Sequence, residues 1–485
     1  MKNRIVFLFG WALVVCHGGF CQNLNTPNLS PQRINELMSD SSVMKANEQN
    51  DANNVPAGIK YPEIRTVDPA NPPVVIDIAG NVNNQKAFKL SDIASSVRYI
   101  MMQSPPDIPI DRFGFKSDDE RLYITTPFGF FCYSNDGKYL FPLYMNQLNV
   151  SKDPQISYRS ISKQNRSHNP AAPPAVTEWD IFTTSTGNMD LLNGKLVYFI
   201  YETATPNGWL NMIDVNDIKT QKPLFTPTEE VKKNGIEPTY QRAVNRRNAG
   251  LGSFLWLDDE SLFIRSSLTN ISLNGDTLCK FGDYDQPTIS REVWRDWDDS
   301  RSYRVDGLVT LQKGFNDTVF RVIPPNRLLP VYVTNWGAYK PDINEFVAAG
   351  AMKGKFILSN WIETTRFIFI HYHEGRVNAF LRLEGKVKDH WAIFDKTKKT
   401  LTHILLQGTS ALIGLIPIPP LLENDIEPIG MPFYPNGVNH KGEMYMTFTK
   451  LDVKKYIDSG KFQKAKLQAI YDSMPDDSFC LMLVK

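Results

Sequence analysis

From Val74 onward the chain repeats one local pattern, in which two short apolar segments are joined by a turn. Segments rich in Val, Ile, Tyr, Phe and Leu alternate with clusters of Asn, Asp, Gly and Pro, as expected for strands connected by tight turns. The stretch RLYITTPFGFFCYSNDGKYLF, which begins at Arg121, shows the pattern most clearly. Its Asp136-Gly137 pair is a strong hairpin signal, because glycine accepts a positive φ without steric cost. The pattern predicts an all-β chain built from hairpins.

The same strand-turn-strand pattern recurs in six later stretches. They are residues 191–201, 254–267, 271–281, 303–322, 355–373 and 390–406. Helical periodicity is clear only in KFQKAKLQAIYDSM, where Leu467, Ile470, Tyr471 and Met474 share one face. A chain with many hairpins and few helices has to cover its sheet edges, and radial arrays of four-stranded sheets do so.

The hairpins between residues 97 and 485 group into six regions of about 65 residues, longer than the ~40–50 residues of common propeller repeats. We therefore predict that residues 73–485 form a six-bladed β-propeller of antiparallel four-stranded sheets with a few short helices in insertions. Two β-sandwich domains are the main alternative, although no composition break near the middle supports them. Propellers commonly close by pairing strands from both termini. The final apolar segment, residues 479–484, should then share a sheet with residues 74–78 or 97–101.

The N-terminal residues 1–21 have the features of a secretory signal peptide. Lys2 and Arg4 precede an apolar run that is too short to cross a bilayer, and small and polar residues follow it. Residues 22–72 are rich in Asn, Ser, Pro, Gln and Asp, which predicts a flexible polar leader, although SPQRINELM could form a short helix capped by Ser30. The sequence thus predicts an exported protein without a transmembrane anchor, located in the periplasm, at the cell surface or outside the cell.

The charge balance argues against a nucleic-acid partner. The chain has 53 Lys and Arg against 52 Asp and Glu, and without the signal peptide its net charge becomes about −1. No long block of like charge supplies the electrostatic footprint of a nucleic-acid binder.

Three cysteines lie beyond the signal peptide, namely Cys132, Cys279 and Cys480. Each has apolar neighbours, so we expect buried thiols, while a disulfide between two of them stays open.

Several segments together resemble a known family, the exported six-bladed β-propeller proteins of Bacteroidetes, most of which have no known function. The segments are KLSDIASSVRYI (89–100), FCYSNDGKYL (131–140), GFNDTVFRV with LLPVYVTNWGAYKP (314–341), ENDIEPIGMPFYP (423–435) and DDSFCLMLVK (476–485). The resemblance spans residues 74–485 and implies the fold without implying catalytic residues. Members commonly carry a lipid-anchoring cysteine, whereas Cys16 and Cys21 here follow Val15 and Phe20 instead of a small residue.

Two motifs could carry chemistry. The HYHE motif places His371 and His373 on one face of a strand with Glu374 on the other, but a metal site needs a third ligand, so we expect strand histidines at a surface or blade edge. Trp294 and Trp297 lie among charged residues, as in some sugar-binding clefts, although a loop-pinning turn would look the same. Large aromatics dominate cores, so the other tryptophans are read as structural. These are Trp179, Trp209, Trp336 and Trp361.

The familiar motifs of hydrolases, metalloproteases, P-loop enzymes and dinucleotide-binding enzymes are absent from the sequence. We therefore assign no catalytic, cofactor-binding or metal-binding residue, and leave the ligand-binding residues open. A non-enzymatic binding scaffold of the cell envelope is favoured, with a glycan, a peptide or an envelope protein as partner. A hydrolase or lyase acting on a glycan in the central funnel is the alternative, because propeller active sites assemble from scattered loop residues.

Overall fold

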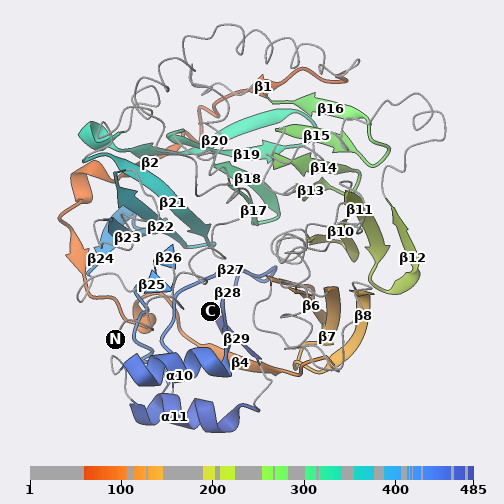
Figure 1. Cartoon of the computed structure of the whole chain (residues 1–485). Coiled ribbons are helices and arrows are strands. Elements are labelled where there is room, and N and C mark those ends of the chain that lie inside the picture. The colour runs from red at the N-terminus through yellow and green to blue at the C-terminus, as the bar shows by residue number, and fades with distance from the viewer. Residues whose placement is uncertain are drawn as a thin grey trace, which may run out of the picture. The chain divides into compact units, whose positions relative to one another are not determined.

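The computed structural model describes residues 59–105, 114–126, 129–145, 189–201, 208–223, 254–265, 268–281, 301–312, 316–340, 354–375, 387–405, 412–413, 416–417, 419–427, 430–459, 464–475 and 479–485. The described residues are mostly strands (Figure 1). The predicted signal peptide, most of the predicted leader and the tryptophan motif at 291–299 lie outside them.

Among the described residues, six sheets each contain four antiparallel strands, in chain order in all but one of them, so the protein is the six-bladed β-propeller that the sequence predicts (Figure 1). Five of the sheets are built from consecutive strands. These are β5 (Gly114–Ser117), β6 (Arg121–Thr126), β7 (Gly129–Ser134) and β8 (Tyr139–Met145); β9 (Met189–Leu192), β10 (Lys195–Tyr201), β11 (Gly208–Asp214) and β12 (Asp217–Pro223); β13 (Phe254–Asp258), β14 (Ser261–Ile264), β15 (Thr269–Ser272) and β16 (Thr277–Lys280); β17 (Arg301–Val305), β18 (Leu308–Gln312), β19 (Thr318–Ile323) and β20 (Arg327–Asn335); and β21 (Phe356–Glu363), β22 (Phe367–Glu374), β23 (Lys388–Asp395) and β24 (Thr400–Ile404).

The predicted turns connect these strands. Asp136-Gly137 joins β7 to β8, and Gly137 has a φ of 89°. Asp306 and Gly307, between β17 and β18, have φ values of 50° and 78°, as a two-residue hairpin with positive φ at both central positions requires. A short ribbon, β25 (Leu412–Ile413) with β26 (Ile416–Pro417), follows β24.

The sixth sheet closes the propeller by combining three C-terminal strands with one N-terminal strand. Its order is β27 (Gly437–Val438), β28 (Met444–Thr449), β29 (Phe479–Val484) and β4 (Val97–Met102). β29 lies between its two neighbours and pairs along its full length with β4, from Phe479 opposite Met102 to Val484 opposite Val97. All six residues of β29 are buried. The predicted closure is confirmed, and of the two candidate N-terminal segments residues 97–101 form the pair.

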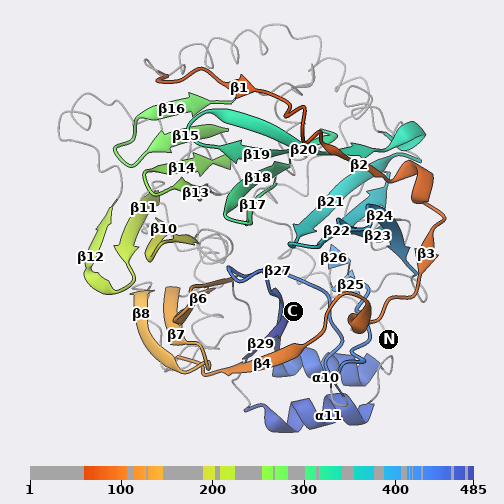
Figure 2. The same cartoon turned by 180° about the vertical axis from the view of Figure 1, so that it is seen from behind.

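The other candidate segment has a different role, because it belongs to an extended N-terminal segment that lines outer sheet edges (Figure 2). We call residues 60–86 the belt. The belt amides of Lys60 and Tyr61 donate to β16, and β1 (Ile64–Arg65) and β2 (Val74–Asp77) then pair parallel with β20. A 3₁₀ turn, η1 (Ala79–Asn81), leads to β3 (Gln85–Lys86), which pairs parallel with β24. Residues 59–72, which the sequence assigns to the leader, thus include a paired strand.

Two features of the belt explain its position. Ile76 and Ile78 are completely buried in the core formed with Tyr332, Trp336 and Tyr372. Gly337, in the 3₁₀ turn η5 (Gly337–Tyr339), has a φ of 51°, and a Cβ at this position would lie 2.9 Å from the Cβ of Ala79. The belt therefore pairs with outer strands whose edges would otherwise expose unpaired backbone groups. It also adds apolar residues to the core.

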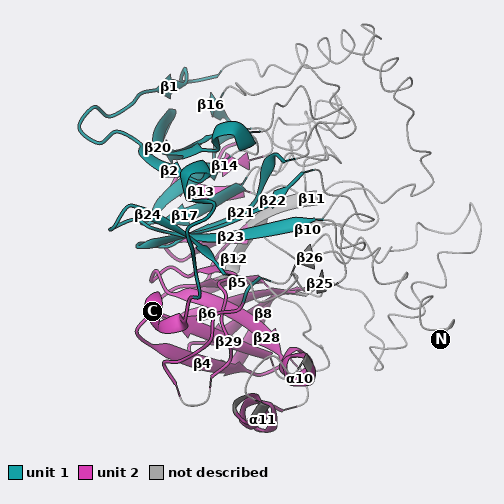
Figure 3. Ribbon diagram, turned by 90° about the vertical axis from the view of Figure 1, so that its left-hand side faces the viewer, with its two compact units in different colours: residues 1–87, 267–272, 276–420 teal, residues 88–266, 273–275, 421–485 magenta. Residues whose placement is uncertain are grey.

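The chain divides into two compact units, coloured in Figure 3. The first comprises residues 1–87, 267–272 and 276–420, and its core lies between the sheets β17–β20 and β21–β24. The second comprises residues 88–266, 273–275 and 421–485. One of its cores joins the closing sheet to the sheet β5–β8 through residues such as Ile100, Phe131 and Leu481.

The two α-helices among the described residues follow β28. α11 (Lys464–Ser473) confirms the predicted helix, with Leu467, Ile470 and Met474 buried. α10 (Lys450–Ser459) was not predicted, because its sequence KLDVKKYIDS has a sparse apolar face of which Val453 is the completely buried member. Neither helix has the length and apolar character required to cross a bilayer.

Candidate functional site

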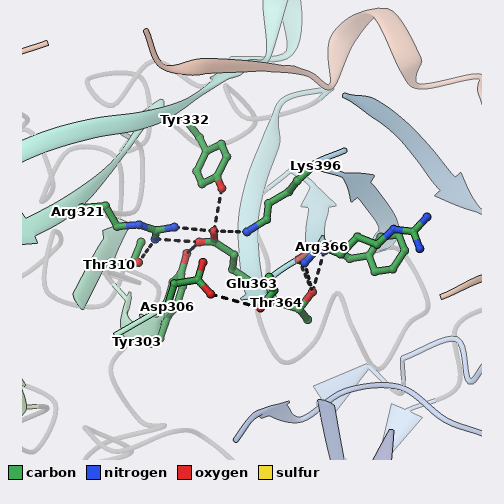
Figure 4. Close-up of polar contacts among 11 residues, drawn as sticks. Tyr303, Asp306, Thr310, Arg321, Tyr332, Glu363, Thr364, Arg366 and Lys396 are labelled. Atoms are coloured by element: carbon green, nitrogen blue, oxygen red, sulfur yellow. Dashed lines mark hydrogen bonds and ion pairs between the residues drawn. The ribbon is translucent and has the colours of Figure 1, made fainter. Parts of the chain in front are cut away.

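A concentrated group of charged and polar side chains in the described part of the first unit surrounds Glu363, the last residue of β21 (Figure 4). The Glu363 side chain is completely shielded from solvent. Four residues of the neighbouring sheet reach it or its partners, namely Tyr303 on β17, Thr310 on β18, Arg321 on β19 and Tyr332 on β20. Lys396, which follows β23, approaches from the same sheet as Glu363. We call these six residues the Glu363 network.

Both oxygens of the Glu363 carboxylate are fully used as acceptors. Arg321 binds them in a bidentate manner, with 2.7 Å from Nη2 to Oε1 and 3.0 Å from Nη1 to Oε2. Oε1 also accepts from the Tyr332 hydroxyl at 2.8 Å and from Lys396 Nζ at 3.0 Å. Oε2 accepts from the Tyr303 hydroxyl at 3.0 Å, and Arg321 also donates to the Thr310 hydroxyl. A carboxylate offers about four lone-pair sites, so this one is saturated by five donors.

The network is stabilised by charge as well as by hydrogen bonds. Burial alone would raise the pKa of Glu363, but hydrogen bonds and positive charge from Arg321, together with the charge of Lys396, hold this pKa below its ordinary value. Burial and the negative charge of Glu363 raise the pKa of Tyr303 well above its ordinary value, and the pKa of Tyr332 is raised for the same reasons. The carboxylate is therefore ionised and both phenols are neutral at physiological pH.

A second layer of contacts fixes the loops beside the network. Asp395 accepts hydrogen bonds from the backbone amides of Thr397 and Lys398, and its other oxygen accepts from Arg366 at 3.2 Å. These bonds hold the turn that carries Lys396. Burial would raise the pKa of Asp395, but the backbone hydrogen bonds and Arg366 outweigh it and lower this pKa.

The geometry suits a structural clasp between two sheets better than a catalytic centre. A general acid needs a proton to donate near neutral pH, whereas the low pKa of Glu363 leaves it without one. A nucleophile or base needs access to substrate, whereas the Glu363 oxygens are shielded and saturated. The network can hold the sheets β17–β20 and β21–β24 in register.

The structure corrects the prediction that His371 and His373 lie at a surface or blade edge. Both are 5% exposed, because β22 is an internal strand whose seven residues from Phe367 to His373 are all buried. His371 Nε2 lies 2.9 Å from Asp389 Oδ1, and its ring stacks on Trp391 with 3.7 Å between centroids. His373 Nδ1 lies 2.9 Å from the carbonyl oxygen of Gly375. Across the described part of the chain, no three His, Cys, Asp or Glu side chains converge as a metal site would require.

Two of these tryptophans agree with the structural interpretation. Trp336 and Trp361 are buried in the core between the sheets β17–β20 and β21–β24. Trp209 lies in β11, while Trp179, Trp294 and Trp297 lie outside the described residues.

The three cysteines are buried free thiols, as predicted. Burial raises the pKa of Cys132 to about 11, of Cys279 to about 11 and of Cys480 to about 12. Because the thiolate is the reactive species, a chain that lacks residues 1–21 should resist thiol reagents at pH 8 while folded and release three thiols in denaturant. Absorbance titration with an aromatic disulfide reagent measures the number of reactive thiols in the folded and in the denatured protein. Rapid modification of any of the three in the folded protein would contradict the assignment.

A comparison with protein families places the chain in one of them. The profile of a family described as a domain of unknown function matches residues 56–171 and 216–459, well over half of the chain. The chain belongs to the DUF4933 family. This membership confirms the resemblance to a propeller family of unknown function.

Two solved structures from Bacteroides are similar to this DUF4933 chain. One is a candidate exported protein from Bacteroides fragilis, with 10% identity, a TM-score of 0.47, and 87% of this chain and 99% of that chain covered. The other is a member of the DUF4221 family from Bacteroides vulgatus, with 6% identity, a TM-score of 0.34, and coverage of 81% and 97%. No curated protein matches the chain.

The sequence analysis missed the Glu363 network. One signal was present, because a glutamate directly follows the apolar residues of FILSNWI, and a charge within a buried strand has to be paired. Its partners come from three other strands and a turn, at sequence distances of 31 to 60 residues for the three donors Tyr332, Lys396 and Tyr303. No local pattern identifies them.

Proposed function

We propose that the chain is an exported, non-enzymatic binding scaffold of the cell envelope. The observation that supports this proposal best is the saturation of Glu363, whose side chain is completely shielded from solvent, by five donors from its own chain. Charged groups used in this way maintain a rigid framework and are not available for substrate chemistry. The N-terminal sequence with Lys2, Arg4 and an apolar run supports export.

A rigid propeller is well suited to binding, because its loops carry variable residues on a scaffold that holds their positions. An exported protein meets the molecules of the cell envelope, so the candidate partners are a glycan, a peptide or an envelope protein. The competing function is cleavage of a glycan by a hydrolase or a lyase. It requires a general acid and a general base whose pKa values are shifted in opposite directions. At the site around Glu363, the two carboxylates Glu363 and Asp395 both have lowered pKa values.

The test uses the chain that lacks residues 1–21 and an insoluble envelope fraction from a Bacteroides strain. Binding is measured by co-sedimentation, and turnover by the release of reducing ends and unsaturated sugars. We expect saturable co-sedimentation without product release. Product release that heat denaturation abolishes would establish the enzymatic alternative, and an absence of both signals would refute the scaffold proposal.

Fractionation of cells that express the full chain tests export separately. The full chain should leave the cytoplasm, and the control variant that lacks residues 1–21 should stay in it.

A further inference from the structure

The belt and the outermost strand β24 meet at a buried histidine. His403 on β24 is 3% exposed, and its backbone amide donates to the belt carbonyl of Asn84 at 2.8 Å. The amide of Leu405 donates to Lys86 at 2.9 Å, and the Asn84 side chain donates to the Leu401 carbonyl at 2.8 Å. These contacts, with the two-residue pairing of β3, hold this end of the belt.

The His403 ring accepts a hydrogen bond from within the sheet. Its Nε2 lies 2.6 Å from the Tyr372 hydroxyl of β22, and the Tyr372 ring stacks on His390 of β23 at 4.9 Å. We assign Nε2 as the acceptor, because the phenol is then the donor to a neutral imidazole. Protonation would turn Nε2 into a donor and remove the acceptor of the Tyr372 hydroxyl hydrogen. A buried imidazolium would then carry a charge without a carboxylate partner in contact.

The groups around His403 do not favour its charged form enough to offset burial. Burial lowers the pKa of His403, and the nearby belt carbonyls of Asn81 and Asn84 counteract only part of this effect. From β23, burial and the charge of His403 lower the pKa of His390. The charged residues that act on His390 from β22 and β23 are Glu374 and Asp389, which raise its pKa, and Lys388, which lowers it.

The two ends of the belt differ in how they are anchored. β2 has four paired residues on β20, and Ile76 and Ile78 beside it are completely buried. β3 has two paired residues, and both are exposed. Lifting residues 81–86 is therefore the smallest opening that brings water to His403, since the alternative disrupts a sheet in which β22 and β23 pair along eight residues.

We propose that the C-terminal end of the belt, residues 81–86, is an acid-sensitive strap that detaches from β24 when His403 is protonated, while β2 stays docked on β20. A group whose pKa is lowered in the closed state favours that state above its ordinary pKa, which is about 6.5 for histidine. The closed strap loses this advantage as the pH falls below that value. Detachment leaves the outer edge of β24 unpaired.

Hydrogen–deuterium exchange with mass spectrometry tests the proposal on the whole chain without residues 1–21, at pH 7.5 and pH 5.0, after correction for intrinsic exchange rates. In the wild-type protein we expect protection of residues 81–86 and of the β24 amides to fall by more than about twofold at pH 5.0, because the closed strap loses its advantage there. Protection of residues 74–78 should change less than about twofold. Equal loss at both ends of the belt, or no loss at pH 5.0, would refute the strap.

Two matched variants identify the responsible group. His403→Gln cannot be protonated, so the difference between the two pH values should disappear. His390→Gln removes the half-buried histidine of this cluster, which the structure does not place against the belt, and should retain the response. A response that His390→Gln abolishes would overturn the assignment to His403. If His403→Gln does not fold, the wild-type comparison and His390→Gln still decide the question.

Discussion

Replacing Glu363 by glutamine should lower the free energy of unfolding by about 3–5 kcal/mol, the range found when one partner of a buried ion pair is removed. Glutamine preserves the shape but leaves the positive charges of Arg321 and Lys396 without their counter-ion. The side-chain NH₂ group of the glutamine would also face the hydrogen-bond donors of Tyr303, Tyr332 or Arg321, where the carboxylate oxygen was an acceptor. Urea denaturation monitored by tryptophan fluorescence measures the change.

Glu374→Gln is the matched control for this substitution. Glu374 is the last residue of β22 in the same sheet and pairs with Lys388 at 3.3 Å, but the Lys388 side chain is 73% exposed. A solvent-exposed pair contributes less than about 1 kcal/mol. The clasp interpretation predicts a large difference between the two variants, and equal destabilisation would contradict it. A variant Glu363→Gln with wild-type stability would show that the two sheets keep their register without the ion pair.

Deleting residues 479–485 should unfold the closing sheet and, with it, the cooperative unit to which that sheet belongs. β29 pairs with β28 on one side and with β4 on the other, so its loss leaves two unpaired edges and removes six buried residues. Phe479, Leu481 and Leu483 also leave the core that they share with the sheet β5–β8. We expect the truncated chain to lose its thermal transition in calorimetry and to accumulate in the insoluble fraction.

Point substitutions separate this effect from a general sensitivity to truncation. Leu481 is completely buried, and Leu481→Ala should cost about 2–5 kcal/mol. Leu451, in α10, is 60% exposed, and Leu451→Ala should change the stability by less than about 0.5 kcal/mol. A truncated protein with native thermal stability would show that strand pairing between the two ends of the chain is not needed for closure.

The Glu363 network and the strap illustrate why the candidate site could not be found from sequence. Each depends on side chains that approach from several strands, and hydrogen bonds in the belt join residues as distant as Asn84 and Leu401. Parallel pairing of β2 with β20 needs no turn, so no local residue pattern marks it. His371 and His373 were placed on one strand correctly, but their burial depends on the strands on both sides of β22.

The sequence by itself determined the hairpins, their order and the number of blades, because alternating apolar residues and Asp-Gly or Asn-Gly turns act over a few neighbouring residues. It also identified the C-terminal apolar segment as a strand of the closing sheet, since a strand that is apolar on both faces has to be internal. Only the tertiary structure decided that residues 97–102 and not 74–77 pair with that strand. Both segments are apolar, and the choice between them depends on which sheet edge each can reach after the blades have formed. The tertiary structure likewise placed five donors around Glu363, because a buried charge selects its partners by position and not by proximity along the chain.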